Sequence, residues 1–372
     1  MAHHVLVTGA AGYVGTHVLV ELIEAGFAPV AIDNRPSALT DAIQKIYQIT
    51  GHMVISFSVD LLDKSSIAKV FDQVQVEHVL HLAGLKAVRE SQGNPLIYYN
   101  VNVIGTINLL EVMDEHGVHN IIFSSSSKVY GVPQYLPLDE KHPTGSCTNP
   151  YGRTKHMVEN ILHDLTISDV RWNVTVLRYF NPSGAHSSGI LGEDQSEKPR
   201  NLMPCICHVA EGKMKKLTIF GKDYDTPDGT AMKGYTHVVD LAKGHIAALK
   251  TSHQNGTYRV YNLGAEKTYS ILDMVKMFEQ ISGKKIVVEF CDRKPGEIAV
   301  CSADSSKAFR ELRWKTDRTL KQMCEDMWHW MTTEKPEQVT NGHVNNTDIS
   351  ATPTHITNGH VNNTDISATD II

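Results

Sequence analysis

Short β-branched runs alternate with longer stretches of helical periodicity up to about residue 180. The runs expected to form strands are Val5–Val7, Pro29–Asp33, Met53–Leu61, His78–Gly84, Asn120–Ser126 and Asn173–Arg178. Helices are expected between them, from about Thr16 and over Val103–Glu115 and Tyr151–Leu165. Strands that alternate with helices build right-handed βαβ units, so the pattern predicts an α/β fold with a doubly wound parallel sheet.

The pattern changes after Asn181-Pro182. Residues 183–232 contain two loops rich in glycine and aspartate around one apolar helix, Met203–Glu211. Alternating α/β character returns at His237–Ala242 and Tyr258–Leu263. We therefore expect a sheet domain formed by residues 1–182 and 233–264, and a smaller mixed α/β domain formed by residues 183–232 and 265–336.

The C-terminal segment has a different composition. The sequence Thr340–Thr352 is repeated letter for letter at Thr357–Thr369. Two copies are too few for a solenoid, which needs at least three repeats. The repeat is polar and has few large apolar residues, so residues 337–372 are predicted to form a disordered tail.

Composition and charge exclude several classes of protein. The net charge of −6 and the pI near 6.4 give no basic surface for a nucleic acid. The six cysteines contain no C-x-x-C pair, which favours free thiols in a reducing compartment and hence a cytoplasmic protein. No purely apolar run approaches the length of a membrane span, so no membrane partner is expected. No metal site is predicted.

Three glycines link the first predicted strand to the first helix. In Gly9-Ala-Ala-Gly12-Tyr-Val-Gly15, the first glycine makes a tight turn, the second lets the backbone approach a pyrophosphate, and the third allows close helix packing. Alone, they also fit an ordinary strand-to-helix turn. Asp33 ends the second strand about 20 residues further on, where a carboxylate binds an adenosine ribose and repels a 2′-phosphate. The combination predicts NAD rather than NADP.

Tyr151 and Lys155 are spaced i, i+4, so they lie on one face of the predicted helix. An ammonium beside a phenol stabilises the phenolate and lowers the phenol pKa, which makes a general base. Ser126 ends the fifth strand, at the sheet edge where open α/β sheets bind ligands, and its hydroxyl can bridge a substrate and the phenol. A surface helix pair and a polar strand end are the structural alternatives.

Together these residues resemble the extended short-chain dehydrogenase/reductase superfamily. Other motifs are similar to those of the UDP-glucose (UDP-galactose) 4-epimerase family, in the same order, from about residue 4 to residue 336. They are Ala83–Val88, Asn149–Gly152, Leu177–Pro182, Gly184–His186, Asn201–Pro204, Phe220–Tyr224, Asp228–Thr230 and His237–Leu241.

This resemblance implies a Rossmann domain that binds NAD, a second domain that binds a UDP-hexose, and a homodimer. The expected NAD contacts are Gly9, Gly12, Tyr13, Val14, Gly15, Asp33, Asn34, Asp60, Leu61, Leu82, Lys86, Lys155 and Tyr179. The expected UDP-sugar contacts are Ser126, Ser127, Lys128, Tyr179, Phe180, Asn181, Arg200, Asn201, Leu202, Thr218, Ile219, Phe220, Lys233, Lys294, Glu297 and Cys301.

The resemblance also implies a mechanism. Tyr151, assisted by Lys155 and Ser126, takes the proton of the sugar 4-hydroxyl while a hydride passes to NAD. The 4-keto sugar then turns about its diphosphate, and the hydride returns to the opposite face. This reaction interconverts UDP-galactose and UDP-glucose. Because Cys301 is small where a tyrosine restricts some relatives, the N-acetylhexosamine pair is expected as well.

Four positions depart from the family pattern. Lys128 replaces a threonine near the sugar, and Glu297 replaces the aspartate that holds the uridine ribose. Lys233 and Lys294 replace arginines that grip the diphosphate, which retains the charge but loses the bidentate fork. These changes affect the expected affinity more than the expected reaction.

Two other functions fit parts of the sequence. A nucleotide-sugar 4,6-dehydratase of the same superfamily needs an Asp-Glu pair directly after the catalytic hydroxyl residue, and Ser127-Lys128 supplies no carboxylate. A catalytically silent NAD-binding or scaffold protein that uses the repeat tail for interaction is the alternative from another class. The complete set of Ser126, Tyr151 and Lys155 argues against it.

Deletion of residues 340–372 should leave both the melting temperature and the activity unchanged, because a polar repeat contributes no core burial. Differential scanning calorimetry of the truncated and full-length chains measures this. A clear drop in melting temperature on truncation would show that the tail docks on the folded part.

Overall fold

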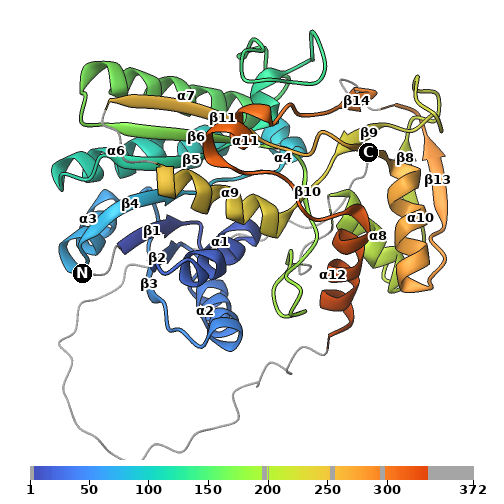
Figure 1. Cartoon of the computed structure of the whole chain (residues 1–372), viewed down its shortest axis with the longest axis horizontal. Helices are drawn as coiled ribbons and strands as arrows, with labels where there is room; N and C mark the ends of the chain where they lie inside the picture. Colours follow the sequence, from blue (N-terminus) through green and yellow to red (C-terminus); the bar gives the residue numbers. More distant parts are fainter. Residues whose placement is uncertain (1–3, 195–198, 200, 252–255, 294–297, 334–372) are drawn as a thin grey trace, which may run out of the picture. The chain divides into compact units, whose positions relative to one another are not determined.

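A seven-stranded sheet forms the centre of the molecule (Figure 1). The computed structural model describes residues 4–194, 199, 201–251, 256–293 and 298–333, and Met1–Thr333 form one compact unit. The strand order is β11-β6-β5-β4-β1-β2-β3, and all neighbouring strands are parallel. The order reverses between β1 and β4, which makes this position the switch point where such sheets bind ligands. The predicted doubly wound α/β fold is confirmed.

The strand positions follow the predicted runs with two corrections. The strands are β1 (His4–Thr8), β2 (Ala28–Asp33), β3 (Ile55–Ser58), β4 (Val76–His81), β5 (Asn120–Ser126), β6 (Asn173–Tyr179) and β11 (Thr257–Leu263). β3 is shorter than predicted because its partner β2 ends at Asp33, which is opposite Ser58. β4 ends at His81, before the predicted Gly84, because the Thr8 hydroxyl accepts hydrogen bonds from the next two backbone N–H groups.

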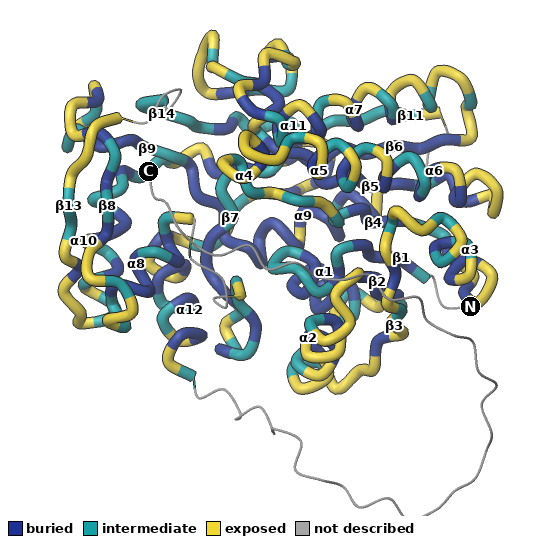
Figure 2. Tube along the Cα trace, turned by 180° about the vertical axis from the view of Figure 1, so that it is seen from behind, coloured by how far each residue is buried: buried dark blue, intermediate teal, exposed yellow. Residues whose placement is uncertain are grey.

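Helices cover both faces of the sheet. One face packs against α1 (Tyr13–Glu24), α2 (Pro36–Thr50), α9 (Val238–Thr251) and α11 (Ser306–Leu312). The other face packs against α3 (Lys64–Gln73), α6 (Gly105–Glu115) and α7 (Pro150–Ser168). Figure 2 shows the strands largely buried and the outer faces of the helices exposed. α1 begins earlier than predicted, directly after the glycine turn at Gly12.

A continuous helical run precedes β5. It consists of α5 (Pro95–Tyr99), a π-helical turn η1 (Asn100–Ile104) and α6, and α4 (Val88–Gly93) lies before it. Only the part from Val103 was predicted. Pro95–Glu115 is long and apolar enough, by length and composition alone, to cross a membrane, which corrects the expectation that no such stretch exists. Of the most apolar 18-residue segment of this stretch, 44% is buried in the protein. Core helices of soluble proteins can have the same length and apolar composition.

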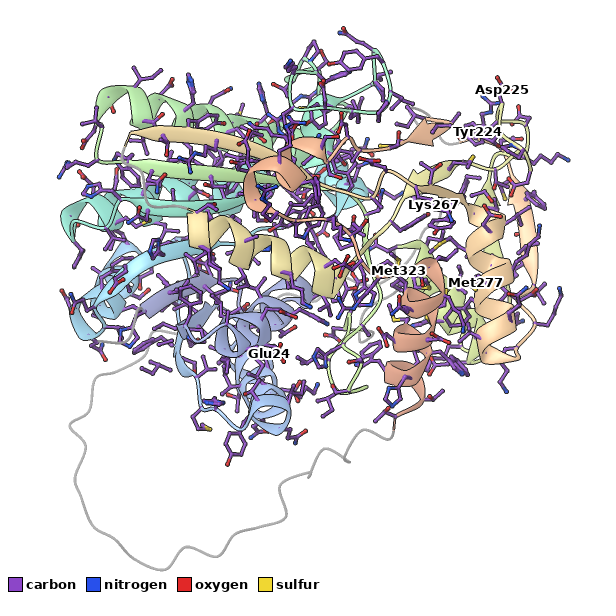
Figure 3. All side chains as sticks on the ribbon, in the orientation of Figure 1. Glu24, Tyr224, Asp225, Lys267, Met277 and Met323 are labelled. Atoms are coloured by element: carbon purple, nitrogen blue, oxygen red, sulfur yellow. The ribbon has the colours of Figure 1, made fainter. Side chains whose placement is uncertain are left out.

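A separate hydrophobic cluster, here called the second hydrophobic cluster, lies outside the large sheet and the helices that cover it. It is built from α8 (Leu202–Ala210), α10 (Ile271–Ser282) and α12 (Leu320–Thr332) with β8 (Leu217–Phe220), which pairs with β13 (Val288–Cys291). Met323 of α12 belongs to this cluster and Met277 of α10 packs against it (Figure 3). Small sheets connect this region to the rest: β7 (Pro182–Ser183) with β10 (Thr236–His237), and β9 (Met232–Gly234) with β12 (Thr268–Ser270) and β14 (Val300–Cys301). The division into two domains remains a prediction.

Candidate active site

The glycine turn lies at the carboxyl end of β1, at the switch point of the sheet. Gly9 has a φ of 67°, and a Cβ on it would lie 2.8 Å from the Ala83 backbone. A Cβ on Gly15 would lie 2.3 Å from the Gly9 carbonyl oxygen, so α1 packs directly against the turn. Gly12 caps α1 and provides no side-chain hydrogen bond. The first N–H groups of α1 are therefore suited to an anionic group such as a pyrophosphate.

Asp33 lies beside this turn at the end of β2 and is 6% exposed. Its carboxylate accepts hydrogen bonds from the Ala11 backbone N–H (3.1 Å) and from the Arg35 Nε (3.0 Å). Asn34 donates to Asp60, whose carboxylate also accepts from the Leu62 backbone N–H. The Asp33 carboxylate is thus fixed beside the turn, where an adenosine ribose would lie.

One carboxylate joins three of the predicted binding residues. Glu193 accepts hydrogen bonds from the Lys86 ammonium (3.0 Å) and the Asn201 amide (3.1 Å). The Lys86 ammonium lies 5.8 Å from the centre of the Tyr13 ring, and the Tyr13 hydroxyl donates to the Gly184 carbonyl (2.5 Å). Burial raises the pKa of Tyr13, and the Glu193 charge raises it further. Sequence reasoning missed Glu193 because it lies in none of the motifs and its partner Lys86 is 107 residues away along the chain.

The catalytic candidates come together at the carboxyl end of β5. Asn149 caps α7 by accepting a hydrogen bond from the Gly152 N–H (2.9 Å), and this cap places Tyr151 in the first turn of the helix. The side chain of Ser126, the last residue of β5, lies near the Tyr151 phenol. Burial raises the pKa of the Tyr151 phenol, and the Ser126 side chain lowers it in part.

Lys155 lies one helical turn beyond Tyr151 and is 5% exposed. Its ammonium donates to the Ser124 carbonyl (2.7 Å) and lies 4.7 Å from the centre of the Phe123 ring. Burial lowers the pKa of Lys155 to about 8. Within the described part of the chain, α7 and β5 thus bring together the phenol, hydroxyl and ammonium that sequence spacing predicted.

A π-helical turn supports this site from the other side. Asn102 accepts from the Leu85 N–H (2.8 Å) and donates to the Leu85 carbonyl (3.0 Å) and to the Thr154 hydroxyl (3.0 Å). The backbone of Gly84 therefore lies close to Lys155, where an added Cβ would be 3.7 Å from the ammonium. Asn102 lies in a largely apolar stretch that also contains Asn100, and nothing in the sequence distinguishes the two.

Tyr179 lies at the end of β6, beside this site. Its hydroxyl is hydrogen-bonded to the ring of His245, and the side chain of Ser124 also contacts it. Burial raises the pKa of Tyr179, and the neighbouring Tyr151 raises it further. Phe180, the next residue, is fully buried, so its side chain supports the site from within the core.

Several predicted sugar contacts lie close to Ser126. Lys128 lies two residues after Ser126, on the 3-10 turn η2 (Ser127–Tyr130). Its backbone N–H donates to the Ser126 hydroxyl (3.2 Å). Cys301 is paired with Lys233 between β14 and β9. Burial raises the pKa of the Cys301 thiol, whereas the charges of Lys128 and Lys233 lower it. The thiol is therefore in the field of both ammonium groups.

The remaining predicted residues are spread more widely. Asn181 has a φ of 38°, and its amide donates to the Gly234 carbonyl (3.0 Å), which links the end of β6 to β9. Leu202 lies on α8, and Thr218, Ile219 and Phe220 lie on β8. Of these, Ile219 is buried in the second hydrophobic cluster and Leu202 packs against it. Val14, Leu61 and Leu82 are partly buried and pack beside the sheet cores. Arg200, Lys294 and Glu297 lie outside the described residues.

The comparisons with known proteins agree with this geometry. The family model described as GDP-mannose 4,6 dehydratase matches residues 6–327. The chain is 50% identical to the UDP-glucose 4-epimerase of Homo sapiens over 89% of its own length and 97% of that protein. It is 49% identical to the enzyme of the same name from Bacillus subtilis, over 88% and 96% of the two chains.

Among solved structures, one similar chain is the UDP-glucose 4-epimerase of Bifidobacterium longum in complex with NAD+ and UDP. The two share 44% identity with a TM-score of 0.84, over 88% of this chain and 98% of that one. The sequence motifs, the fold and the relatives thus agree. The chain belongs to the UDP-glucose 4-epimerase family.

Proposed function

We propose that the protein is an NAD-dependent epimerase that interconverts UDP-galactose and UDP-glucose by transient oxidation at C4. The observation that carries this is the position of Tyr151, beside Ser126 and followed by Lys155, at the same edge of the parallel sheet as the glycine turn. An acid/base group and a dinucleotide site at one sheet edge suit reversible removal of a proton and a hydride from one alcohol. Relatives of the family crystallised with NAD and with UDP or a UDP-sugar support both ligands.

The cofactor site fits NAD on the evidence of the residues present. The open N-terminus of α1 and the close packing at Gly15 leave room for backbone contact with a pyrophosphate. Asp33 would supply the carboxylate for the adenosine ribose, and the Lys86 ammonium lies over the ring of Tyr13, the first residue of α1. When bound, NAD would supply a group that accepts a hydride from carbon 4 of the sugar and returns it.

The chain moves the proton. The Tyr151 oxygen accepts it from the sugar 4-hydroxyl and gives it back after the keto sugar has presented its other face. Lys155 stabilises the phenolate by its positive charge, and the Ser124 carbonyl fixes where that charge lies. The Ser126 hydroxyl would donate its one proton to the substrate oxygen and accept a hydrogen bond from the Tyr151 hydroxyl once that oxygen is protonated.

The UDP part is proposed to be held tightly and the sugar loosely, because one pocket has to accept both epimers. Lys233 and Lys294 would neutralise the diphosphate, and Asn181 and Asn201 would bind it from the loops after β6 and before α8. A lysine is a point charge without the planar fork of arginine, so it restrains the diphosphate less.

The dehydratase alternative has only the broad family model in its favour. Elimination of water needs a carboxylic acid and a carboxylate next to the catalytic hydroxyl residue, and Ser127 and Lys128 occupy those positions. The silent-scaffold alternative differs from the proposal in one measurable property, which is turnover.

Replacement of Tyr151 by phenylalanine should preserve the fold and NAD binding but reduce kcat by roughly 10²–10⁴-fold, because only the proton-accepting oxygen is lost. A coupled assay of UDP-galactose conversion measures kcat, and fluorescence titration measures NAD binding. As a matched control, Tyr135→Phe removes an exposed phenol outside the site and should keep full activity. Epimerisation by Tyr151→Phe at the wild-type rate would remove Tyr151 from the mechanism.

Cys301 is proposed to set which sugars enter. It is small and partly buried, and it lies beside the Lys233 strand. A small residue here leaves space for an N-acetyl group at C2, so the N-acetylhexosamine pair is a proposed second substrate pair.

Cys301→Tyr should therefore abolish conversion of UDP-N-acetylgalactosamine and spare that of UDP-galactose, because overfilling affects only the larger substrate. Product analysis by liquid chromatography of both reactions decides this. Wild-type protein that converts UDP-galactose but makes no product from UDP-N-acetylgalactosamine would contradict the proposal. Cys301→Ser is the control that keeps the volume.

A homodimer in the cytoplasm completes the proposal. All six cysteines are free, which suits a reducing compartment. Leu96, Ile97 and Ile104 expose 80%, 55% and 45% of their surface around an apolar groove, and Met157 of the adjoining α7 exposes 43%. A second copy with the same two helices, related by a two-fold axis, would cover this face in both chains.

Two charges in this face, Leu96→Glu with Ile97→Glu, should convert the dimer into a monomer that sediments at half the mass. Analytical ultracentrifugation measures the change. Val287→Glu, which charges an exposed apolar residue in the loop directly before β13, should leave the dimer intact. Wild-type protein that sediments as a monomer would refute the proposed assembly.

A further inference from the structure

A buried carboxylate that the mechanism above does not use lies one helical turn beyond Lys155. Tyr151, Lys155 and Glu159 follow one another at i, i+4 and i+8 on α7, so they share one face of the helix. Glu159 is 3% exposed and Lys155 is 5% exposed. Two opposite charges at this spacing, both away from water, interact much more strongly than a surface pair.

Glu159 is held in a fixed position by two strands of the sheet. Arg178 of β6 donates to it from Nε (3.0 Å) and from Nη2 (2.6 Å). Ser125 of β5 donates its hydroxyl to the same carboxylate (2.5 Å). The two carboxylate oxygens of Glu159 thus accept three hydrogen bonds, two from the Arg178 guanidinium and one from the Ser125 hydroxyl. These bonds fix the orientation of the carboxylate.

The same network extends to the strands that carry the site. Ser125 precedes Ser126, and Arg178 precedes Tyr179, so each strand places one residue in the site and its neighbour in the network. Arg178 also donates to the Tyr130 hydroxyl (3.0 Å), which in turn donates to Asn262 of β11 (2.6 Å). The network therefore links α7 to β5, β6 and β11 behind the site.

The charges around Lys155 can be accounted for element by element. His81 of β4 is buried between the Thr8 and Thr106 hydroxyls, and burial and the Lys155 charge lower its pKa to about 3, so it is neutral. β5 supplies the Ser124 carbonyl and the Phe123 ring. The phenols near the site on α7, β6 and β11, all with a raised pKa, are Tyr151, Tyr179 and Tyr258. Arg178 is the only other cation in this network among the described residues, and its charge is shared with Glu159.

Burial alone disfavours the Lys155 ammonium, and Glu159 is the charge that opposes this effect and raises the Lys155 pKa. The proposed epimerase needs that ammonium, since a neutral lysine does not stabilise a phenolate.

We propose that Glu159 is a positioning residue of the active site: fixed by Arg178 and Ser125, its carboxylate keeps Lys155 charged so that Lys155 can serve Tyr151. This inference rests on the proposed epimerase activity. A residue with this role acts through Lys155 and does not touch the substrate. Its loss changes the pH range of activity as well as the rate.

The sign of the effect follows from the charges. A group whose pKa is raised by a carboxylate loses that increase when the carboxylate becomes an amide. In Glu159→Gln, Lys155 should therefore lose its proton at lower pH. The alkaline limb of the kcat profile should move down by about 1 pH unit. A purely structural role would lower kcat by the same factor at every pH and would lower the melting temperature. It would leave the alkaline limb of the kcat profile in place.

The experiment measures kcat for UDP-galactose against pH in full-length protein with bound NAD. Glu140→Gln is the matched control, because Glu140 accepts from the Asn262 N–H (2.7 Å) next to the same network but does not act on Lys155. Its limb should match that of the wild type. Since Glu159→Gln leaves Arg178 as an unpaired buried charge, the double variant Glu159→Gln/Arg178→Gln removes both charges and provides a folded alternative.

A downward shift in Glu159→Gln, or in the double variant if the single one does not fold, supports the inference. An unchanged limb in an active, folded variant overturns it and leaves the epimerase assignment intact. An inactive wild-type protein would overturn the epimerase assignment itself, and the inference with it.

Discussion

The proposed active site depends on keeping one positive charge, that of Lys155, at a position where only 5% of the residue is exposed to water. Burial opposes the charge, and the ammonium has one short hydrogen bond, to the Ser124 carbonyl. The Tyr151 side chain is partly buried, and desolvation raises the pKa of its phenol, so each group alone would favour its neutral form. In the proposed mechanism, the ammonium stabilises the phenolate, and a proton moves between enzyme and substrate.

The sheet brings the parts of this site to one edge. β1 ends in the glycine turn, β2 in Asp33, β5 in Ser126 and β6 in Tyr179. Because these strands are parallel, their carboxyl ends meet on the same side of the molecule, and residues far apart in the sequence become neighbours. Because Gly9 and Gly15 have no Cβ, which would collide with the backbone there, α1 can lie close to this edge. Its N-terminus then faces the space for a dinucleotide.

The residues that sequence reasoning found share a local signature. Gly9, Gly12 and Gly15 follow a strand, and Tyr151 and Lys155 have helical spacing, so a short window of sequence contains both the residue types and the geometry. β5 was predicted with correct ends because a β-branched run ends in a cluster of serines.

The residues that sequence reasoning missed do not lie in a short stretch of sequence that contains both the residue types and the geometry. Glu159 is one of many acidic residues on helices, and its partner Arg178 is on another strand. Glu193 becomes informative only when Lys86 and Asn201 are next to it. The ends of β3 and β4 are set by the partner strand and by the Thr8 hydroxyl, neither of which local periodicity reports.

The central claim is that one alcohol carbon loses and regains a hydride within the same active site. Conversion of UDP-galactose labelled with deuterium at C4 tests this most directly, with mass spectrometry and proton NMR of the UDP-glucose formed. The account predicts that the product carries the deuterium at C4 and that none is lost to the solvent. Product with hydrogen at C4, or no product from the wild-type protein, would contradict it.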